Sequence, residues 1–183
     1  AFPDHDLSAD ALHAQAGIEH RRKRFDESSR LARVFLERHA QHKLASAAAF
    51  LLAESEFLGG RFAEAVAEFR AFLARYPNDA RATDARSRLG ASLYRSGKLD
   101  EAEPFLRETG TGGEIGAQTA LVALGDVYFQ RGEWKQAEEV LLKYLHAGDA
   151  VPAAEDALLR VGLAQSRQGR HEEAVRSLDQ LLS

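Results

Sequence analysis

The chain repeats a short sequence pattern five times, and this internal repeat constrains its fold more than any other feature. Each clear copy places a glycine two residues before a large side chain and five residues before an alanine, at residues 60–65, 97–102, 132–137 and 169–174. A weaker copy at residues 23–28 precedes them and ends in Ser28. The last residues of successive copies lie 37, 37, 35 and 37 positions apart. A regular spacing of this length predicts a tandem array of similar structural units.

Helix-period patterns lie on both sides of each copy. Residues 89–93 and 124–128 place apolar residues and a glycine at positions i, i+1 and i+4, which share one face of a helix. After the turn, Ala65, Phe69, Phe72 and Leu73 again follow helical spacing. Each unit is therefore predicted to be a helix, a tight turn at the glycine, and a second helix.

The pattern resembles the tetratricopeptide repeat, which has small residues at close-packing sites and an aromatic residue after the turn. The resemblance covers nearly the whole chain and implies an all-α, right-handed superhelical solenoid of about five helix–turn–helix repeats. The expected organisation is a single domain over residues 1–183, with repeats at about 7–41, 45–77, 80–110, 115–147 and 152–182. The first repeat departs most from the family pattern, with Gln15 at a usually apolar position and Lys23 at the turn.

Local signals refine these boundaries. Three glycines at equivalent helical positions, residues 90, 125 and 162, suggest close helix packing, because glycine in a helix costs about 1 kcal/mol relative to alanine. Asp100 and Glu103 are interpreted as a capping box that opens a second helix. Residues 110–113, Gly-Thr-Gly-Gly, are expected to break the chain between the third and fourth repeats.

Composition excludes several classes of function. The net charge of −4 lacks the strongly basic character that binding to a phosphate backbone requires, so no nucleic acid partner is expected. The absence of cysteine excludes disulfides, thiolate metal sites and cysteine nucleophiles. No apolar stretch approaches the roughly 18–20 residues of a membrane span. Because the sequence contains no methionine, we expect its first residue to be a processed or engineered end.

The ionisable residues do not indicate catalysis. Acid pairs such as Glu54 with Glu56 and Glu138 with Glu139 are interpreted as solvated helix faces, because acid–base chemistry requires a pocket that shifts one pKa. Histidines cluster early, at residues 5, 13, 20, 39 and 42, but without a His-Glu-x-x-His pattern. We therefore predict no catalytic residue, no cofactor and no metal site. A metalloprotein or an enzyme is the least favoured alternative.

The family resemblance implies a partner-binding groove on a concave face lined by the first helix of each repeat. The family positions carry over to Phe50, Glu54, Phe57, Tyr94, Val122, Asp126, Phe129, Leu159 and Arg167. The alternative interpretation is that some of these rings simply pack between repeats. The resemblance therefore implies a non-catalytic scaffold that binds a protein or peptide ligand.

The C-terminal helix suggests a different activity. Val175, Leu178, Leu181 and Leu182 form an apolar stripe at helical spacing, and no later helix follows to cover it. We expect this stripe to mediate self-association, giving a homo-oligomer, or to mark the chain as a piece of a longer protein. The alternative function is thus a self-assembling structural module.

One segment suggests a cellular location. Residues 69–79, together with the following Leu89-Gly90 and second glycine turn, are similar to bacterial cell-envelope repeat proteins. These include the periplasmic Tol–Pal coordinator and the lipoprotein of the outer-membrane β-barrel assembly machine. The resemblance implies a periplasmic or cell-envelope location. The cytoplasm remains the alternative, because the absence of cysteine suits both compartments.

Overall fold

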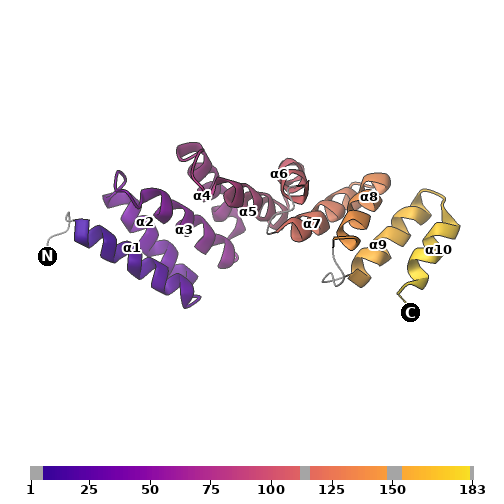
Figure 1. Cartoon of the computed structure of the whole chain (residues 1–183), viewed down its shortest axis with the longest axis horizontal. Coiled ribbons are helices and arrows are strands. Elements are labelled where there is room, and N and C mark those ends of the chain that lie inside the picture. The colour runs from indigo at the N-terminus through magenta and orange to yellow at the C-terminus, as the bar shows by residue number, and fades with distance from the viewer. Residues whose placement is uncertain (1–5, 112–115, 148–153, 182–183) are drawn as a thin grey trace. The chain divides into compact units, whose positions relative to one another are not determined.

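The structure, a computed structural model, describes residues 6–111, 116–147 and 154–181, and these residues form ten α-helices and no β-strand (Figure 1). The helices are α1 (Asp6–Arg21), α2 (Phe25–Arg38), α3 (Ala45–Leu58), α4 (Phe62–Arg75), α5 (Ala82–Arg95), α6 (Leu99–Thr111), α7 (Ala117–Gln130), α8 (Trp134–Leu145), α9 (Ala154–Arg167) and α10 (His171–Asp179). The predicted all-α repeat fold is confirmed.

Each predicted repeat holds one pair of these helices, from α1 and α2 in the first to α9 and α10 in the fifth. The chain divides into two compact units, residues 1–98 with α1 to α5 and residues 99–183 with α6 to α10. The division falls at the turn of the third repeat. The single domain over 1–183 stays a prediction.

The turns within the pairs adopt a left-handed backbone conformation. Four glycines take it, at residues 60, 97, 132 and 169, with φ between 73° and 78°. A residue with a Cβ atom is disfavoured there, which explains why glycine recurs at this position. Lys23 takes the same conformation at the first turn, with φ of 60°, so that the turn geometry survives the loss of glycine. At the turns with glycine and at the turn with Lys23, the backbone amide of the following residue donates to a carbonyl at the end of the first helix. Arg61 N, for example, donates to the Glu56 carbonyl at 2.9 Å.

Two helix glycines allow the paired helices to approach closely. A Cβ atom placed on Gly125 of α7 would lie 2.6 Å from Leu141 Cδ2 of α8. The same atom on Gly162 of α9 would lie 2.7 Å from Leu178 Cγ of α10. Both separations are shorter than carbon atoms tolerate, so these leucines occupy the space that a side chain would fill. The prediction of close packing at these two glycines is confirmed.

Each unit has its own apolar core. In unit 1 the largest fully buried side chains are Phe35, Phe69, Phe72, Leu89 and Leu93. In unit 2 they are Leu106, Val127, Leu141 and Val161. Within each unit a helix packs mainly against its neighbours in sequence, as in a linear array.

Two local predictions at α6 need correction. Glu103 does not serve a capping box: its Oε1 accepts a hydrogen bond from the Tyr128 hydroxyl at 3.0 Å, and its Oε2 pairs with Arg131. The helix also continues through Gly110 to Thr111, because the helical pattern of α6 outlasts one glycine. The rest of the predicted Gly-rich break, residues 112 and 113, lies outside the described residues.

Candidate partner-binding surface

The first helices of unit 1 share a network of charged side chains. Arg88 of α5 lies between two acids, with NH2 2.9 Å from Glu54 Oε1 of α3 and Nε 3.3 Å from Asp84 Oδ1 of its own helix. The other oxygen of Glu54, Oε2, lies 3.6 Å from His20 Nε2 of α1. Glu54 therefore links all three first helices of the unit and is only partly exposed.

Hydrogen bonds fix the tautomer of His20. The Ser28 hydroxyl donates to the Ala16 carbonyl at 3.0 Å, and the Ser55 hydroxyl donates to Ser28 Oγ at 2.9 Å. Ser55 Oγ can then only accept from His20 Nδ1, which lies 2.9 Å away. His20 Nδ1 is therefore the nitrogen that carries the ring proton, and Nε2 faces the Glu54 carboxylate.

The predicted aromatic stripe of unit 1 divides into core and surface rings. Phe50 is only 8% exposed and packs edge-to-face on Phe72 at 5.5 Å, so its assignment to a binding groove is corrected to a core role. Phe57 is partly exposed, packs edge-to-face on Phe62 at 5.8 Å, and has the Arg88 guanidinium 5.7 Å from its centre. Tyr94 is also partly exposed, at the end of α5.

Unit 2 repeats the ionic arrangement on α7 and α9. Arg160 of α9 lies between Asp126 Oδ1 of α7, 2.6 Å from NH1, and Asp156 Oδ2, 3.1 Å from Nε. Gln130 Nε2 donates to the second oxygen of Asp126 at 2.7 Å. Phe129 is partly exposed and packs edge-to-face on Trp134 at 5.2 Å.

The most exposed apolar side chain at the predicted groove positions lies on α9, beside a second exposed leucine. Leu159 is 43% exposed and Leu163, one turn further along, is 42% exposed. Arg167, a further turn on, is exposed and has its guanidinium 5.8 Å from the Trp134 ring centre. Val122 of α7 is partly exposed. Leu159 and Leu163 therefore form an exposed apolar ridge on α9, and Arg160 of the same helix is paired with two acids.

The predicted C-terminal stripe is only partly open. Leu178 packs into the space above Gly162 and is partly buried, as is Leu181. Val175 is 57% exposed and is the most open apolar side chain of the stripe among the described residues. Leu182 lies outside the described residues.

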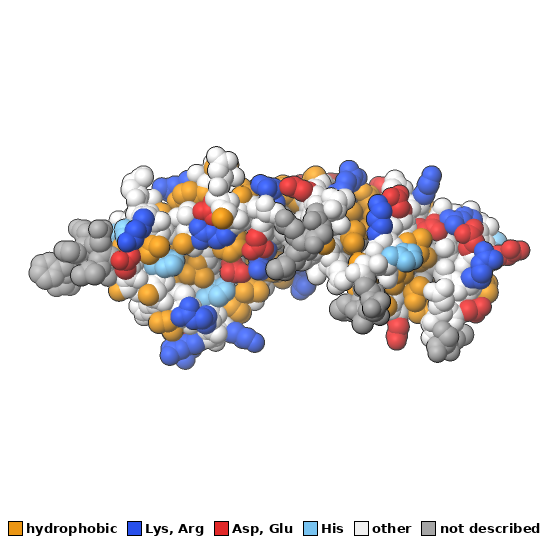
Figure 2. Space-filling view, in the orientation of Figure 1, with side chains coloured by type: hydrophobic (Ala, Val, Ile, Leu, Met, Phe, Trp, Pro, Cys, Tyr) orange, Lys and Arg blue, Asp and Glu red, His pale blue; other side chains and the backbone are white. Residues whose placement is uncertain are grey.

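The early histidines surround a buried phenylalanine. The rings of His13, His39 and His42 lie 5.6 to 5.9 Å from the ring of Phe35. Figure 2 shows histidine side chains among hydrophobic ones over α1 to α3. Burial lowers the pKa of His13, and the nearby Arg81 cation adds to this effect. No group of three potential metal ligands occurs among the described residues. The arrangement is that of rings packed at the edge of a core.

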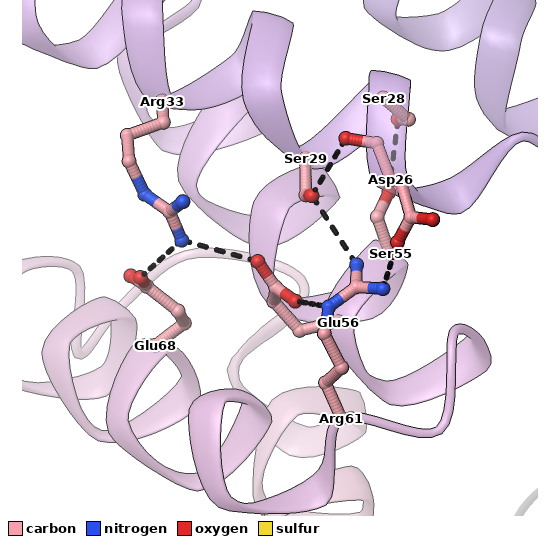
Figure 3. Close-up of polar contacts among 8 residues, drawn as sticks. All are labelled: Asp26, Ser28, Ser29, Arg33, Ser55, Glu56, Arg61 and Glu68. Carbon is pink, nitrogen blue, oxygen red and sulfur yellow. Dashed lines mark hydrogen bonds and ion pairs between the residues drawn. The ribbon is translucent and has the colours of Figure 1, made fainter.

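Two acids that were interpreted as solvated are buried, and that interpretation is wrong for them. Glu56 is 2% exposed and accepts hydrogen bonds from Arg33 NH2 at 3.1 Å and from Arg61 (Figure 3). Arg33 also reaches Glu68 at 3.3 Å, and Arg61 reaches Asp26, so the network joins α2, α3 and α4. A buried carboxylate needs such partners, and the network serves to hold helices together.

Glu138 plays the same part in unit 2. It is 7% exposed and accepts hydrogen bonds from Gln165 at 3.0 Å, Gln168 at 2.8 Å and Arg170 at 2.6 Å. Burial alone would raise the pKa of Glu138, but these donors outweigh burial and lower it. Such acids belong to the junctions between repeats and not to a reactive site.

Sequence reasoning missed how the surface charges are connected. The pairs Asp84 with Arg88 and Asp156 with Arg160 have i, i+4 spacing on one helix face, which is a readable signal. Their second partners, Glu54 and Asp126, come from the preceding repeat 34 residues earlier. To predict these contacts one must know how residues of successive repeats align, in addition to the period of the helix.

Two family models and several solved structures match the chain. Residues 5–163 match the tetratricopeptide repeat-like domain, and residues 156–183 match the tetratricopeptide repeat. Among solved structures, MamA of AMB-1 is 16% identical, with a TM-score of 0.79 over 97% of this chain and 91% of that chain. MamA from residue 41 to its end, from Desulfovibrio magneticus RS-1, is 18% identical, with a TM-score of 0.75 over 95% of this chain and 93% of that one. Likeness at this identity concerns the fold.

No curated protein matches the chain. Among the described residues, no helix is both long and apolar enough to cross a membrane.

Proposed function

This chain belongs to the tetratricopeptide repeat-like family, a class of protein–protein interaction modules, and we propose that it is a non-catalytic scaffold. The proposed ligand is a peptide or protein partner, bound in a groove along the first helices of the repeats. Membership of the family supports a role in binding proteins, and the exposed leucines of α9 support the position of the groove.

The observation that carries this proposal is the pair Leu159 and Leu163. Two leucines that are each more than 40% exposed, one turn apart on a first helix, form an apolar ridge that nothing in the described unit covers. Burial of apolar area contributes roughly 25 cal/mol per Å², so covering both side chains favours association. Exposed apolar patches rimmed by polar groups are typical of interaction surfaces.

The neighbouring groups suit such an interface. Phe129 and Trp134 supply rings at one end of the ridge, and partly buried rings often carry much of the binding energy. Arg160 is already paired with two acids, so that it contributes no unpaired charge when a partner covers it.

The test compares two sets of apolar-to-polar variants. A partner isolated from the native cell with the purified chain is titrated against Leu159→Ser/Leu163→Ser and against Ile18→Ser, a matched exposed apolar residue on α1. We expect the double variant to bind at least tenfold more weakly, while its helicity and the affinity of the Ile18 variant stay unchanged. Equal affinity of all three chains would remove the ridge from the binding surface.

A second candidate function is self-assembly through α10. Its support is the open side chain of Val175, at a position where the second helix of each earlier repeat carries a buried or half-buried residue. Sedimentation equilibrium over a concentration series distinguishes the two functions, because self-assembly predicts a dimer or larger species. A strictly monomeric chain would contradict self-assembly, and the partner-binding scaffold would be the remaining candidate.

The proposed location is the bacterial periplasm or cell envelope, with the cytoplasm as the alternative. Its support is the likeness of residues 69–79 to envelope repeat proteins such as the Tol–Pal coordinator. Fractionation of the native cell with an antibody against the chain tests it, and recovery of the chain with cytoplasmic markers would contradict it.

A further inference from the structure

The two units carry the same six-residue constellation at a fixed offset. In unit 1 it comprises Glu54, Phe57, Phe62, Asp84, Arg88 and Arg95. In unit 2 it comprises Asp126, Phe129, Trp134, Asp156, Arg160 and Arg167. Each residue of the second set lies 72 positions after its counterpart, and acid matches acid, ring matches ring and arginine matches arginine.

The geometry is repeated along with the sequence. An arginine bridges an acid of its own helix and an acid of the preceding first helix, at 3.3 and 2.9 Å in unit 1 and at 3.1 and 2.6 Å in unit 2. Two rings pack edge-to-face, at 5.8 Å and 5.2 Å between centres. A second arginine lies over the second ring, with Arg95 4.8 Å from the centre of Phe62 and Arg167 5.8 Å from the centre of Trp134.

The two arginines of each set differ in one respect. Arg88 and Arg160 are each paired with two carboxylates. Arg95 and Arg167 are exposed, and each contacts an aromatic ring but no carboxylate within the described part of the chain. Packing on a ring restrains the guanidinium without using its N–H donors.

A restrained arginine with free donors is suited to a carboxylate, which it binds through two parallel hydrogen bonds. The surface beside it is apolar: on α9, Leu159, Leu163 and Arg167 follow at i, i+4 and i+8, so that they form one ridge. In unit 1, Arg95 lies over the partly exposed ring of Phe62, which packs against the partly exposed ring of Phe57.

We propose that Arg95 and Arg167 are two equivalent anion-binding subsites, one in each unit, for peptide segments that carry a carboxylate beside an apolar side chain. The chain is then bivalent and takes two such segments, from a partner with a repeated acidic–apolar motif or from two partner molecules. This inference rests on the proposed function and specifies the chemistry and number of its ligands. Linking two segments in one partner raises its apparent affinity by effective concentration.

The probes are two pools of twelve-residue peptides, one built from Leu, Ser and Glu and the other with Lys in place of Glu. Fluorescence polarisation measures binding of each labelled pool to the full chain, and native mass spectrometry counts the bound copies of the tightest Glu peptide. We expect the Glu pool to bind at least tenfold more tightly than the Lys pool, with two copies per chain.

The variants assign each copy to its arginine. Arg95→Ala and Arg167→Ala should each leave one bound copy, and the double variant should weaken the Glu peptide by about tenfold or more, the loss expected for a charged hydrogen bond. Arg38→Ala and Arg176→Ala, which remove exposed arginines of α2 and α10, should leave both copies bound. Far-ultraviolet circular dichroism verifies that each variant keeps its helices.

Three results would overturn the inference. Equal binding of the two pools would show that no carboxylate is selected, and unchanged binding in the double variant would place the ligand elsewhere. Binding of the Lys pool that Leu163→Ser abolishes, but Arg167→Ala does not, would refute the anion subsites and leave the scaffold function standing. Failure of both pools to bind would refute the inference, and the partner titration with the Leu159 and Leu163 variant would then decide the proposed function separately.

Discussion

Replacing Gly125 with alanine should destabilise the protein, although alanine is the better helix former. In an open helix the change would stabilise by about 1 kcal/mol. At Gly125 the new Cβ would lie 2.6 Å from Cδ2 and 2.7 Å from Cγ of Leu141, a side chain that is fully buried in α8. Overpacking of this kind costs about 1–3 kcal/mol, so the net effect is a loss of up to about 2 kcal/mol.

Gly17→Ala is the matched control. Gly17 also lies inside a helix, but the nearest atom to its added Cβ is Arg21 NH1 at 3.6 Å, the end of a flexible side chain. We expect this variant to gain about 1 kcal/mol. The difference between the two variants therefore isolates the overpacking cost, because the helix-propensity gain is common to both.

Urea unfolding measures both effects. Fluorescence of Trp134, the single tryptophan, reports on unit 2, and far-ultraviolet circular dichroism reports on the whole chain. Truncating Leu141 to alanine costs about 2–5 kcal/mol alone and should cost less when Gly125 is already alanine, because the added methyl group occupies part of the space. If Gly125→Ala stabilised the protein as much as Gly17→Ala, α7 and α8 would not approach as described.

Three other changes test separate parts of the structure. Tyr76→Phe should leave the urea midpoint unchanged or raise it, because the Tyr76 hydroxyl is buried without a hydrogen-bond partner in the described part of the chain; a loss above about 1 kcal/mol would mean that the hydroxyl is bonded. Burial and the Arg81 charge lower the pKa of His13, so protonation of this ring favours the unfolded state. The free energy of unfolding should therefore fall as the pH drops below about 6.5, and His13→Gln should reduce that fall. Equal pH profiles of the two chains would exclude His13 as the source. Val175→Glu should abolish any dimer seen in sedimentation and keep the fold, because this side chain is 57% exposed; a dimer that persists would place self-association elsewhere.

The sequence predicted the repeat architecture well because each repeat satisfies local rules. Helix period, glycine at a left-handed turn and glycine at a close crossing can all be read from one repeat and confirmed in the next. The turn at Lys23 shows how far this extends: the first repeat lost its glycine, yet the register of the other repeats placed the turn correctly.

The groove was harder to predict, because a position carried over from the family does not say whether its side chain is exposed or covered by a neighbouring helix. Phe50 stands at a groove position of the family, but its ring packs edge-to-face on Phe69 and Phe72 of α4 and joins the core. Glu56 and Glu138 look like surface acids in the sequence. They are buried because arginines of neighbouring repeats, 23 residues before Glu56 and 32 residues after Glu138, supply the opposite charge. Such partners depend on packing between repeats, which a single helix pattern does not contain.

Site-specific photo-crosslinking in the native cell tests the scaffold function most directly. A photoreactive phenylalanine analogue replaces Leu163 on the first helix α9, or Lys135 and Glu139 on the exposed side of the second helix α8. We expect irradiation to join one partner protein to position 163 and neither α8 position to give this product. Adducts at Lys135 or Glu139 with none at Leu163 would contradict binding along the first helices.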